Sequence, residues 1–229
     1  FLLFTTQKTF LVILSYDNVW RWNMVYFISL ILFALLAGIA SAIFKIPFWV
    51  VITIIVIIAI GRLGYMLYMT YRSKDLVKLE RFLDSSMRNP LNQYILTQKD
   101  GDVKTQMAAI DALLARYSSP VVQGTYKASR AMLVKDYKTA REAAATIPNI
   151  AMKNYSLALI EATIGKKNHS AQYTLAKPWM KSLIEAIVSY REGDLKNYEL
   201  HKNVSLEQTS GIQYFSNYYF FERIQQYVS

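Results

Sequence analysis

The chain contains no cysteine, and its only histidines among 229 residues are His169 and His201. Without a thiol it cannot build a disulfide framework, an iron–sulfur cluster, a zinc ribbon or a thiolate nucleophile. The two histidines lie far apart in polar stretches, and no group of carboxylates at metal-ligand spacing accompanies them. We therefore expect no bound metal and no cofactor, and we expect both histidines to be solvated or to cap helices.

Catalytic sequence motifs are missing as well. The eight glycines are scattered and form neither a Walker phosphate loop, nor a Gly-x-Gly-x-x-Gly turn, nor a Gly-x-Ser-x-Gly elbow. Because no nucleophile, base or phosphate-binding loop can be assigned, we predict that the chain has no catalytic residues and is not an enzyme.

Long runs of one charge are also lacking. The net charge is +10, most of it after residue 72, where lysine and arginine alternate with carboxylates. This interleaving argues against nucleic acid as a partner. It suits a domain held beside an anionic lipid bilayer, where each basic group near the lipid contributes about 1 kcal/mol.

Two long apolar runs dominate the first third of the chain. Residues 24–44 carry no charge, Lys45 to Pro47 make a break, and a second run extends to Tyr71. About 20 apolar residues in a helix cross a hydrocarbon core of about 30 Å. We therefore predict a transmembrane helical hairpin over residues 24–71. Residues 1–23 are predicted to be an interfacial segment, with a disordered or packed strand as the alternative.

Four residues in the predicted spans are candidates for helix packing or partner contacts. Ala34, Gly38 and Ala42 recur every four residues and form a small-residue stripe, which favours close helix packing in lipid. The second span is the nearest partner for this stripe, and a homodimer is the alternative. Arg62 interrupts the second apolar run. It is expected either to reach the headgroups or to contact a carboxylate of a partner subunit.

Basic residues crowd the exit from the second span, whereas Lys45 stands alone in the short connection. These residues are Arg72, Lys74, Lys78, Arg81 and Arg88. The positive-inside rule then predicts that both termini and the soluble domain lie in the cytoplasm. The composition of the chain, which is rich in Lys, Ile and Tyr and free of Cys, suggests a bacterial protein.

Helical periodicity continues from residue 72 to the end, so the predicted fold class is all-α. Residues 72–89 are predicted to form a juxtamembrane linking helix, followed by a helical domain over residues 90–229. Prolines punctuate this domain at nearly equal intervals, and one polar break lies inside each interval, so each interval is expected to hold two helices. The prolines are Pro90, Pro120, Pro148 and Pro178.

The clearest unit runs from Ala128 through Leu133 and Lys135-Asp136-Tyr137 to Ala140 and Ala143, with Pro148 closing it. It resembles the tetratricopeptide repeat family, although the period is nearer 29 than 34 residues and the consensus Trp and Leu-Gly are missing. The resemblance implies an α-solenoid of about four helix pairs. Two spans followed by such repeats also resemble the layout of HemY-type bacterial membrane proteins.

Tetratricopeptide-like domains bind other proteins, so the resemblance implies a protein-interaction surface. Gln123, Lys127 and Arg130 share one face of the helix after Pro120, and we consider both a solvated face and a groove for a carboxylate-bearing peptide. The aromatic segment 212–228 is expected to form one helix, clasped by the last repeat or docked on a partner or the membrane.

The function expected from the sequence is that of a membrane-anchored interaction scaffold or accessory subunit of a bacterial membrane complex. The alternative is a small accessory subunit of a transporter or export machine that acts mainly through its transmembrane helices.

Overall fold

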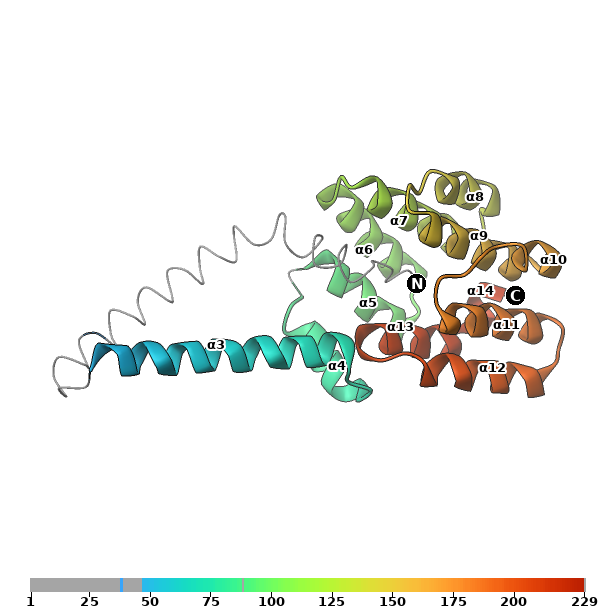
Figure 1. Ribbon diagram of the computed structural model, residues 1–229. Helices are drawn as coiled ribbons and strands as arrows, with labels where there is room; N and C mark the ends of the chain where they lie inside the picture. Colours follow the sequence, from blue (N-terminus) through green and yellow to red (C-terminus); the bar gives the residue numbers. More distant parts are fainter. Residues whose placement is uncertain (1–37, 39–46, 88, 229) are drawn as a thin grey trace. The chain divides into compact units, whose positions relative to one another are not determined.

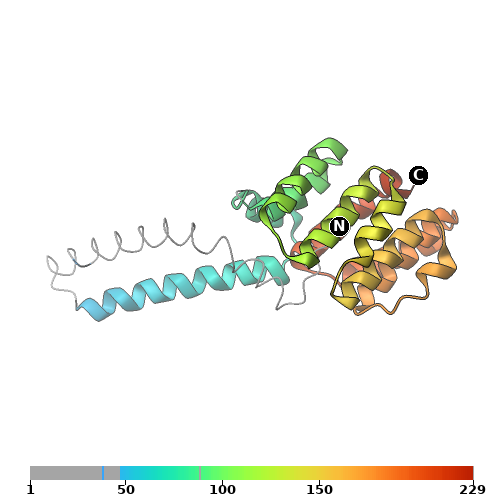
Figure 2. The same ribbon diagram turned by 90° about the horizontal axis from the view of Figure 1, so that it is seen from above.

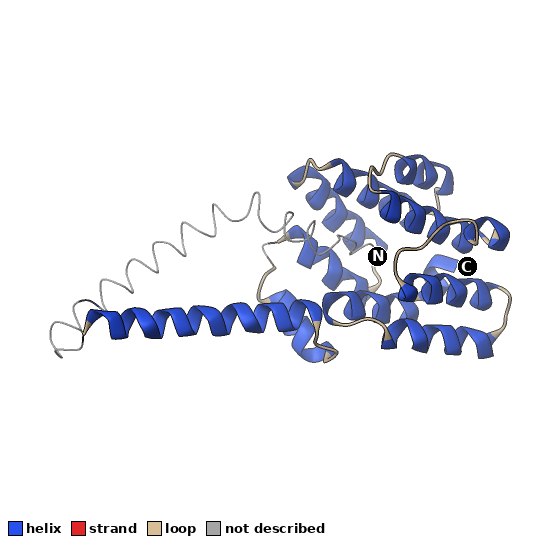
Figure 3. Cartoon of the chain, viewed as in Figure 1, coloured by secondary structure: helices blue, strands red, loops and turns tan. Residues whose placement is uncertain are grey.

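The computed structural model describes residues 38, 47–87 and 89–228. These residues are helical or lie in turns, and none of them belongs to a β-strand, which confirms the all-α class for this part of the chain (Figure 3). The described chain divides into two compact units, one ending at Tyr68 and the other beginning at Met69. Each unit is described by itself below.

Helix α3 (Phe48–Tyr71) is long and apolar enough over Trp49–Tyr71 to cross a membrane. None of its most apolar stretch is buried against other parts of the protein, and Ile57 and Ile60 are each more than 60% exposed. Such a surface is typical of a helix that lies in an apolar environment or packs against another protein. The first predicted span, residues 24–44, lies outside the described residues except for Gly38, so the hairpin itself remains a prediction.

The linking helix is shorter than the predicted range 72–89. Helix α4 covers Leu76–Asp84, and Asp75 caps it by accepting a hydrogen bond from the Lys78 backbone N–H at 3.0 Å. Leu79 and Leu83, one turn apart, are fully buried. The four residues before α4 leave the helix, so α3 and α4 are separate elements.

Six helices follow, with ends at the prolines and polar breaks of the sequence: α5 (Pro90–Asp100), α6 (Val103–Arg116), α7 (Pro120–Leu133), α8 (Tyr137–Ala145), α9 (Ile150–Ile164) and α10 (Lys167–Ser170). Two more are α11 (Pro178–Arg191) and α12 (Leu195–Glu207). Proline occupies the first turn of α5, α7 and α11, where its missing N–H leaves no helical hydrogen bond unmade. The polar breaks predicted inside the four intervals are confirmed as helix ends.

Three of the intervals form pairs of long helices that contact each other, namely α5 with α6, α7 with α8, and α11 with α12. Asp102, Asp136 and Asp194 cap the second helix of each pair. The third interval differs from the expectation, because α10 is a single turn and the chain then stays non-helical until Pro178. There the Asn154 side chain donates a hydrogen bond to the Thr174 carbonyl at 3.2 Å.

The aromatic segment forms two helices rather than the one predicted. Helix α13 (Gly211–Glu222) and helix α14 (Ile224–Val228) are separated by a break at Arg223. Helix α13 packs against α12, α4 and α5, and α14 packs against α9 and α11 (Figures 1 and 2). The segment 211–228, called the C-terminal segment below, thus joins the first helices of the domain to the last.

The start of the domain is bonded directly to the turn before α13. The Gly211 N–H donates to the Ser73 carbonyl at 2.6 Å, and the Ser210 hydroxyl donates to the Tyr71 carbonyl at 2.6 Å. Gly211 has a φ of +63°, and a Cβ there would overlap the Thr70 carbonyl oxygen. Only glycine allows this close approach of two backbones.

Candidate functional site

The first helix of each interval contributes one buried aromatic ring. Tyr94 of α5 meets Tyr126 of α7 edge-on, with 5.4 Å between ring centroids. Tyr155 of α9 meets Trp179 of α11 edge-on at 5.7 Å. Such pairs contribute about 0.5–1.5 kcal/mol beyond the area that they bury. Burial raises the pKa of Tyr94 and Tyr155 far above the ordinary value, so both hydroxyls stay neutral.

Helix α14 places a further aromatic ring among these helices. Tyr227 is 7% exposed, its ring lies 5.3 Å from that of Phe220, and its hydroxyl donates to Gln106 Oε1 at 3.4 Å. Gln106 is itself buried, and its Nε2 donor hydrogen-bonds no atom of the described chain. Burial raises the pKa of Tyr227 to about 12.

Two arginines connect the C-terminal segment to the rest of the domain through hydrogen bonds to backbone carbonyl groups. Arg223 donates through Nε and Nη2 to the Lys99 carbonyl, in the last turn of α5. Arg191, at the end of α11, donates through Nη1 to the Thr163 carbonyl at 2.5 Å and to the Val228 carbonyl at 2.9 Å. A guanidinium can satisfy several carbonyl groups at once because its donors are arranged in a planar fork. Arg191 therefore ties α9, α11 and α14 together.

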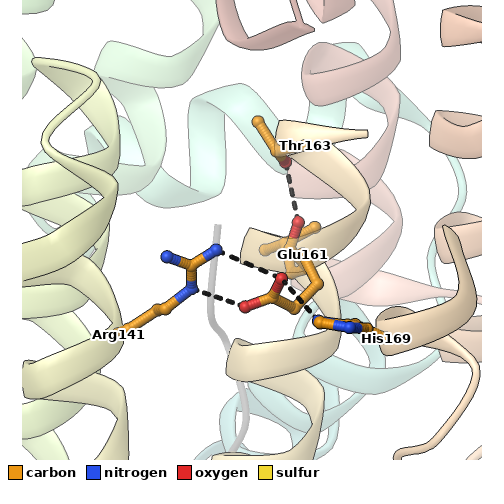
Figure 4. Close-up of polar contacts among 5 residues, drawn as sticks. Arg141, Glu161, Thr163 and His169 are labelled. Carbon is orange, nitrogen blue, oxygen red and sulfur yellow. Dashed lines mark hydrogen bonds and ion pairs between the residues drawn. The ribbon is translucent and has the colours of Figure 1, made fainter. Parts of the chain in front are cut away.

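A buried carboxylate lies on the other side of α9. The Glu161 side chain is only 6% exposed and accepts two hydrogen bonds from Arg141 of α8, at 2.5 and 3.2 Å. His169 Nδ1 of α10 lies 3.8 Å from Glu161 Oε2 on the opposite side (Figure 4). A charge this deeply buried requires such a partner, so the cluster fixes α8, α9 and α10 relative to one another.

The residues predicted to bind a partner's carboxylate are largely used inside the domain. Gln123 donates through Nε2 to the Leu114 and Tyr117 carbonyls, at 2.8 and 2.7 Å. Arg130 forms a two-point ion pair with Asp111, with Nε–Oδ1 at 2.7 Å. Both contacts link α7 to α6. Lys127 lies between them along the helix and is exposed, so it is the member of the predicted face best placed to meet another molecule.

The predicted membrane residues are described only in part. Arg62 lies on an exposed side of α3. Ala34 and Ala42 lie outside the described residues. A Cβ placed on Gly38 would meet no atom within 4 Å. The small-residue stripe therefore stays a prediction.

Sequence reasoning missed Arg191, Arg223 and Glu161. A short-range signal existed for the arginines, because each follows an aromatic or aliphatic helix face and stands at a helix end, where basic side chains find carbonyl groups. The partners of Glu161 come from two other helices. Each histidine lies beside one glutamate: His169 is 3.8 Å from Glu161 and its side chain is 59% exposed, and His201 is 3.3 Å from Glu185.

The described residues contain no group of three or more histidine, aspartate or glutamate side chains that could hold a metal ion. The strongest candidate for a functional surface is the face of α9 and α11 on which α14 packs. Comparisons with protein-family models, with curated proteins and with solved structures find no match to this chain.

Proposed function

We propose that this chain is a membrane-anchored interaction scaffold or accessory subunit of a bacterial membrane complex, whose helical domain binds another protein. The observation that carries the proposal is α3, an apolar helix of membrane-spanning length with exposed side chains, which leads directly into a folded helical domain. An anchor of this kind confines the domain to the membrane surface, where it raises the local concentration of the domain near membrane-bound partners.

The architecture of the domain supports binding as its role. We propose that its successive helix pairs are degenerate tetratricopeptide-like repeats stacked as an α-solenoid. The proline at the start of α5, α7 and α11 and the aromatic ring contributed by each first helix support this reading. Stacked pairs expose one continuous face of first helices, and such faces bind peptide segments of other proteins.

We further propose that the domain and both termini are cytoplasmic, because Arg72, Lys74 and Lys78 follow the span. The natural absence of cysteine allows a direct test with the variant Ser85→Cys, since Ser85 is exposed. A membrane-impermeant maleimide should label this residue only after the cells are opened. Labelling in intact cells would contradict the cytoplasmic orientation and place the domain outside.

To test whether the domain binds the partner, the membrane-spanning helix is replaced while the domain is kept unchanged. In the test variant, residues 49–68 are replaced by an unrelated apolar helix of equal length, and both proteins are purified from membranes in mild detergent. If the domain binds the partner, the same protein co-purifies with the wild type and with the exchanged variant. Loss of that protein from the exchanged variant alone would reject the proposal.

The second candidate function is that of a small subunit of a transporter or export machine. The observation in its favour is Arg62, a permanent charge within an apolar helix, because charged side chains in membrane helices often contact other subunits. Under this alternative, the variant Arg62→Leu loses the co-purifying partner while the domain stays folded.

A further inference from the structure

Helix α14 rests on the face of α9 and α11 with one side buried. Ile224, Tyr227 and Val228 are each less than 10% exposed, whereas Gln225 and Gln226 face solvent. The buried side thus presents one aromatic ring flanked by two aliphatic side chains. The same pattern of apolar anchors is what a short helical peptide offers when it binds in a groove.

The polar contacts of α14 use groups that any peptide of this kind can supply. Arg191 binds the backbone carbonyl of Val228 at 2.9 Å, which every residue possesses. The Tyr227 hydroxyl meets Gln106, whose Nε2 has no hydrogen-bond partner in the described chain. The receiving face of α9 and α11 therefore has a carbonyl-binding guanidinium and, beside it, a buried amide with an unused donor.

Helix α14 is short and is separated from α13 by a break in the helix. A helix of five residues is unstable by itself, since it is far below the length at which isolated helices persist in water. The chain breaks at Arg223, and Arg223 is held independently on the Lys99 carbonyl. Helix α13 can therefore keep its packing on α4, α5 and α12 while α14 leaves its place.

We propose that the face beneath α14 is the peptide-binding site of the domain, and that residues 224–228 occupy it as an internal ligand. This inference rests on the proposed function and assigns the site through which it acts. The partner segment it fits carries an aromatic residue between aliphatic residues and presents a backbone carbonyl to Arg191. Because the internal ligand is covalently attached, it lowers the apparent affinity for such a segment in proportion to the fraction of sites left open.

The test measures binding of a labelled peptide of residues 219–228 to the full chain in mild detergent. Wild type is compared with Tyr227→Ala, which loosens the internal ligand, and with Gln225→Ala, a control at an exposed position of the same helix. Tyr227→Ala is expected to bind the peptide at least tenfold more tightly than wild type, and Gln225→Ala to bind it as wild type does. A scrambled peptide and a peptide with the final tyrosine changed to alanine should bind to neither variant.

A second variant keeps the test valid if Tyr227→Ala fails to fold, as judged by circular dichroism. Tyr227→Phe retains the ring and loses only the hydroxyl contact to Gln106, so it should strengthen peptide binding by about two- to fivefold, as expected for one neutral hydrogen bond. Equal peptide binding by wild type and both folded variants, or no binding by any of them, overturns the inference.

The outcomes separate the two proposals. If the co-purifying partner follows the domain but is not displaced by an excess of the 219–228 peptide, the inference fails and the proposed function stands. If the partner is lost on span exchange, the proposed function fails whatever the peptide does. Concentration-dependent dimers that the peptide dissolves would assign the face to a second copy of the chain, and so would overturn the partner assigned here.

Discussion

At the residue scale, the stability of the domain depends on the ion pair between the buried Glu161 carboxylate and Arg141. Removing Arg141 leaves a buried carboxylate without its main partner, which costs about 3–5 kcal/mol for fully buried pairs. Arg141 is 35% exposed, so water partly compensates. We expect Arg141→Met to lower the free energy of unfolding by about 2 kcal/mol, measured by urea denaturation.

Arg130→Met is the matched control, because the Asp111 partner of Arg130 is half exposed and such surface pairs contribute about 0–1 kcal/mol. The double variant Arg141→Met, Glu161→Met removes both charges and should be at least as stable as Arg141→Met alone. Equal losses for Arg141→Met and Arg130→Met would show that the Glu161 cluster does not act as a buried ion pair.

Tyr227 gives the domain a pH dependence in the alkaline range. Its pKa is raised by burial to about 12 in the folded chain and returns to 10.0 on unfolding. A group whose folded pKa is raised contributes stability that is complete below the unfolded pKa and is lost between the two values. At pH 11 the wild type should have lost about 1 kcal/mol relative to pH 9 that Tyr227→Phe does not lose.

Urea denaturation of both proteins at the two pH values measures this difference. The comparison with Tyr227→Phe cancels the contributions of the other tyrosines and lysines. If both proteins lose the same stability between pH 9 and 11, Tyr227 is not buried in the folded state and α14 is not in the place described.

At the element scale, the junction between the end of α3 and the start of α13 depends on Gly211. Gly211→Ala forces a Cβ against the Thr70 carbonyl, in a backbone conformation that also disfavours alanine. Gly193 has a similar φ of +73°, but a Cβ there meets no atom within 4 Å. We expect Gly193→Ala to cost about 1 kcal/mol and Gly211→Ala to cost at least about 2 kcal/mol more, from the free energy of unfolding. Similar costs for both variants would show that the junction is not closely packed.

Helix existence and helix ends were largely predictable, because the signals are local. Proline at a first helical turn and aspartate at a cap act through backbone groups a few residues away, and Pro90, Asp102 and Asp194 stand where the structure begins its helices. The short α10 was not predictable from these signals. The residues after Ser170 carry helical spacing, yet Asn154 of α9 holds the chain at Thr174.

The site was less predictable than the fold. Gln123, Lys127 and Arg130 share a face of α7, as the spacing predicts, but the sequence does not show that Asp111 and two carbonyls of the α6 end lie against them. The covered face depends on contacts across more than 100 residues, such as Arg223 with Lys99. Contacts of that sequence separation leave no periodic pattern in a single chain.

At the scale of the whole molecule, the anchor and the domain serve separate roles in this account. Helix α3 offers a mainly apolar surface and Arg62 to its surroundings, whereas the domain offers the face beneath α14 with its defined polar contacts. Location then comes from the helix and selectivity from the domain. The two-span hairpin, the cytoplasmic side and the repeat architecture are proposals that this division of roles does not require.

Site-specific photocrosslinking in native membranes tests that division most directly. A photoreactive residue is placed at Lys127 in the domain, and at Ile57 or Ile60 in the span, and the crosslinked proteins are identified. If the domain binds the partner, a partner protein is crosslinked from Lys127 and the span positions yield lipid adducts. A partner protein crosslinked from Ile57 or Ile60, with none from the domain, would contradict it.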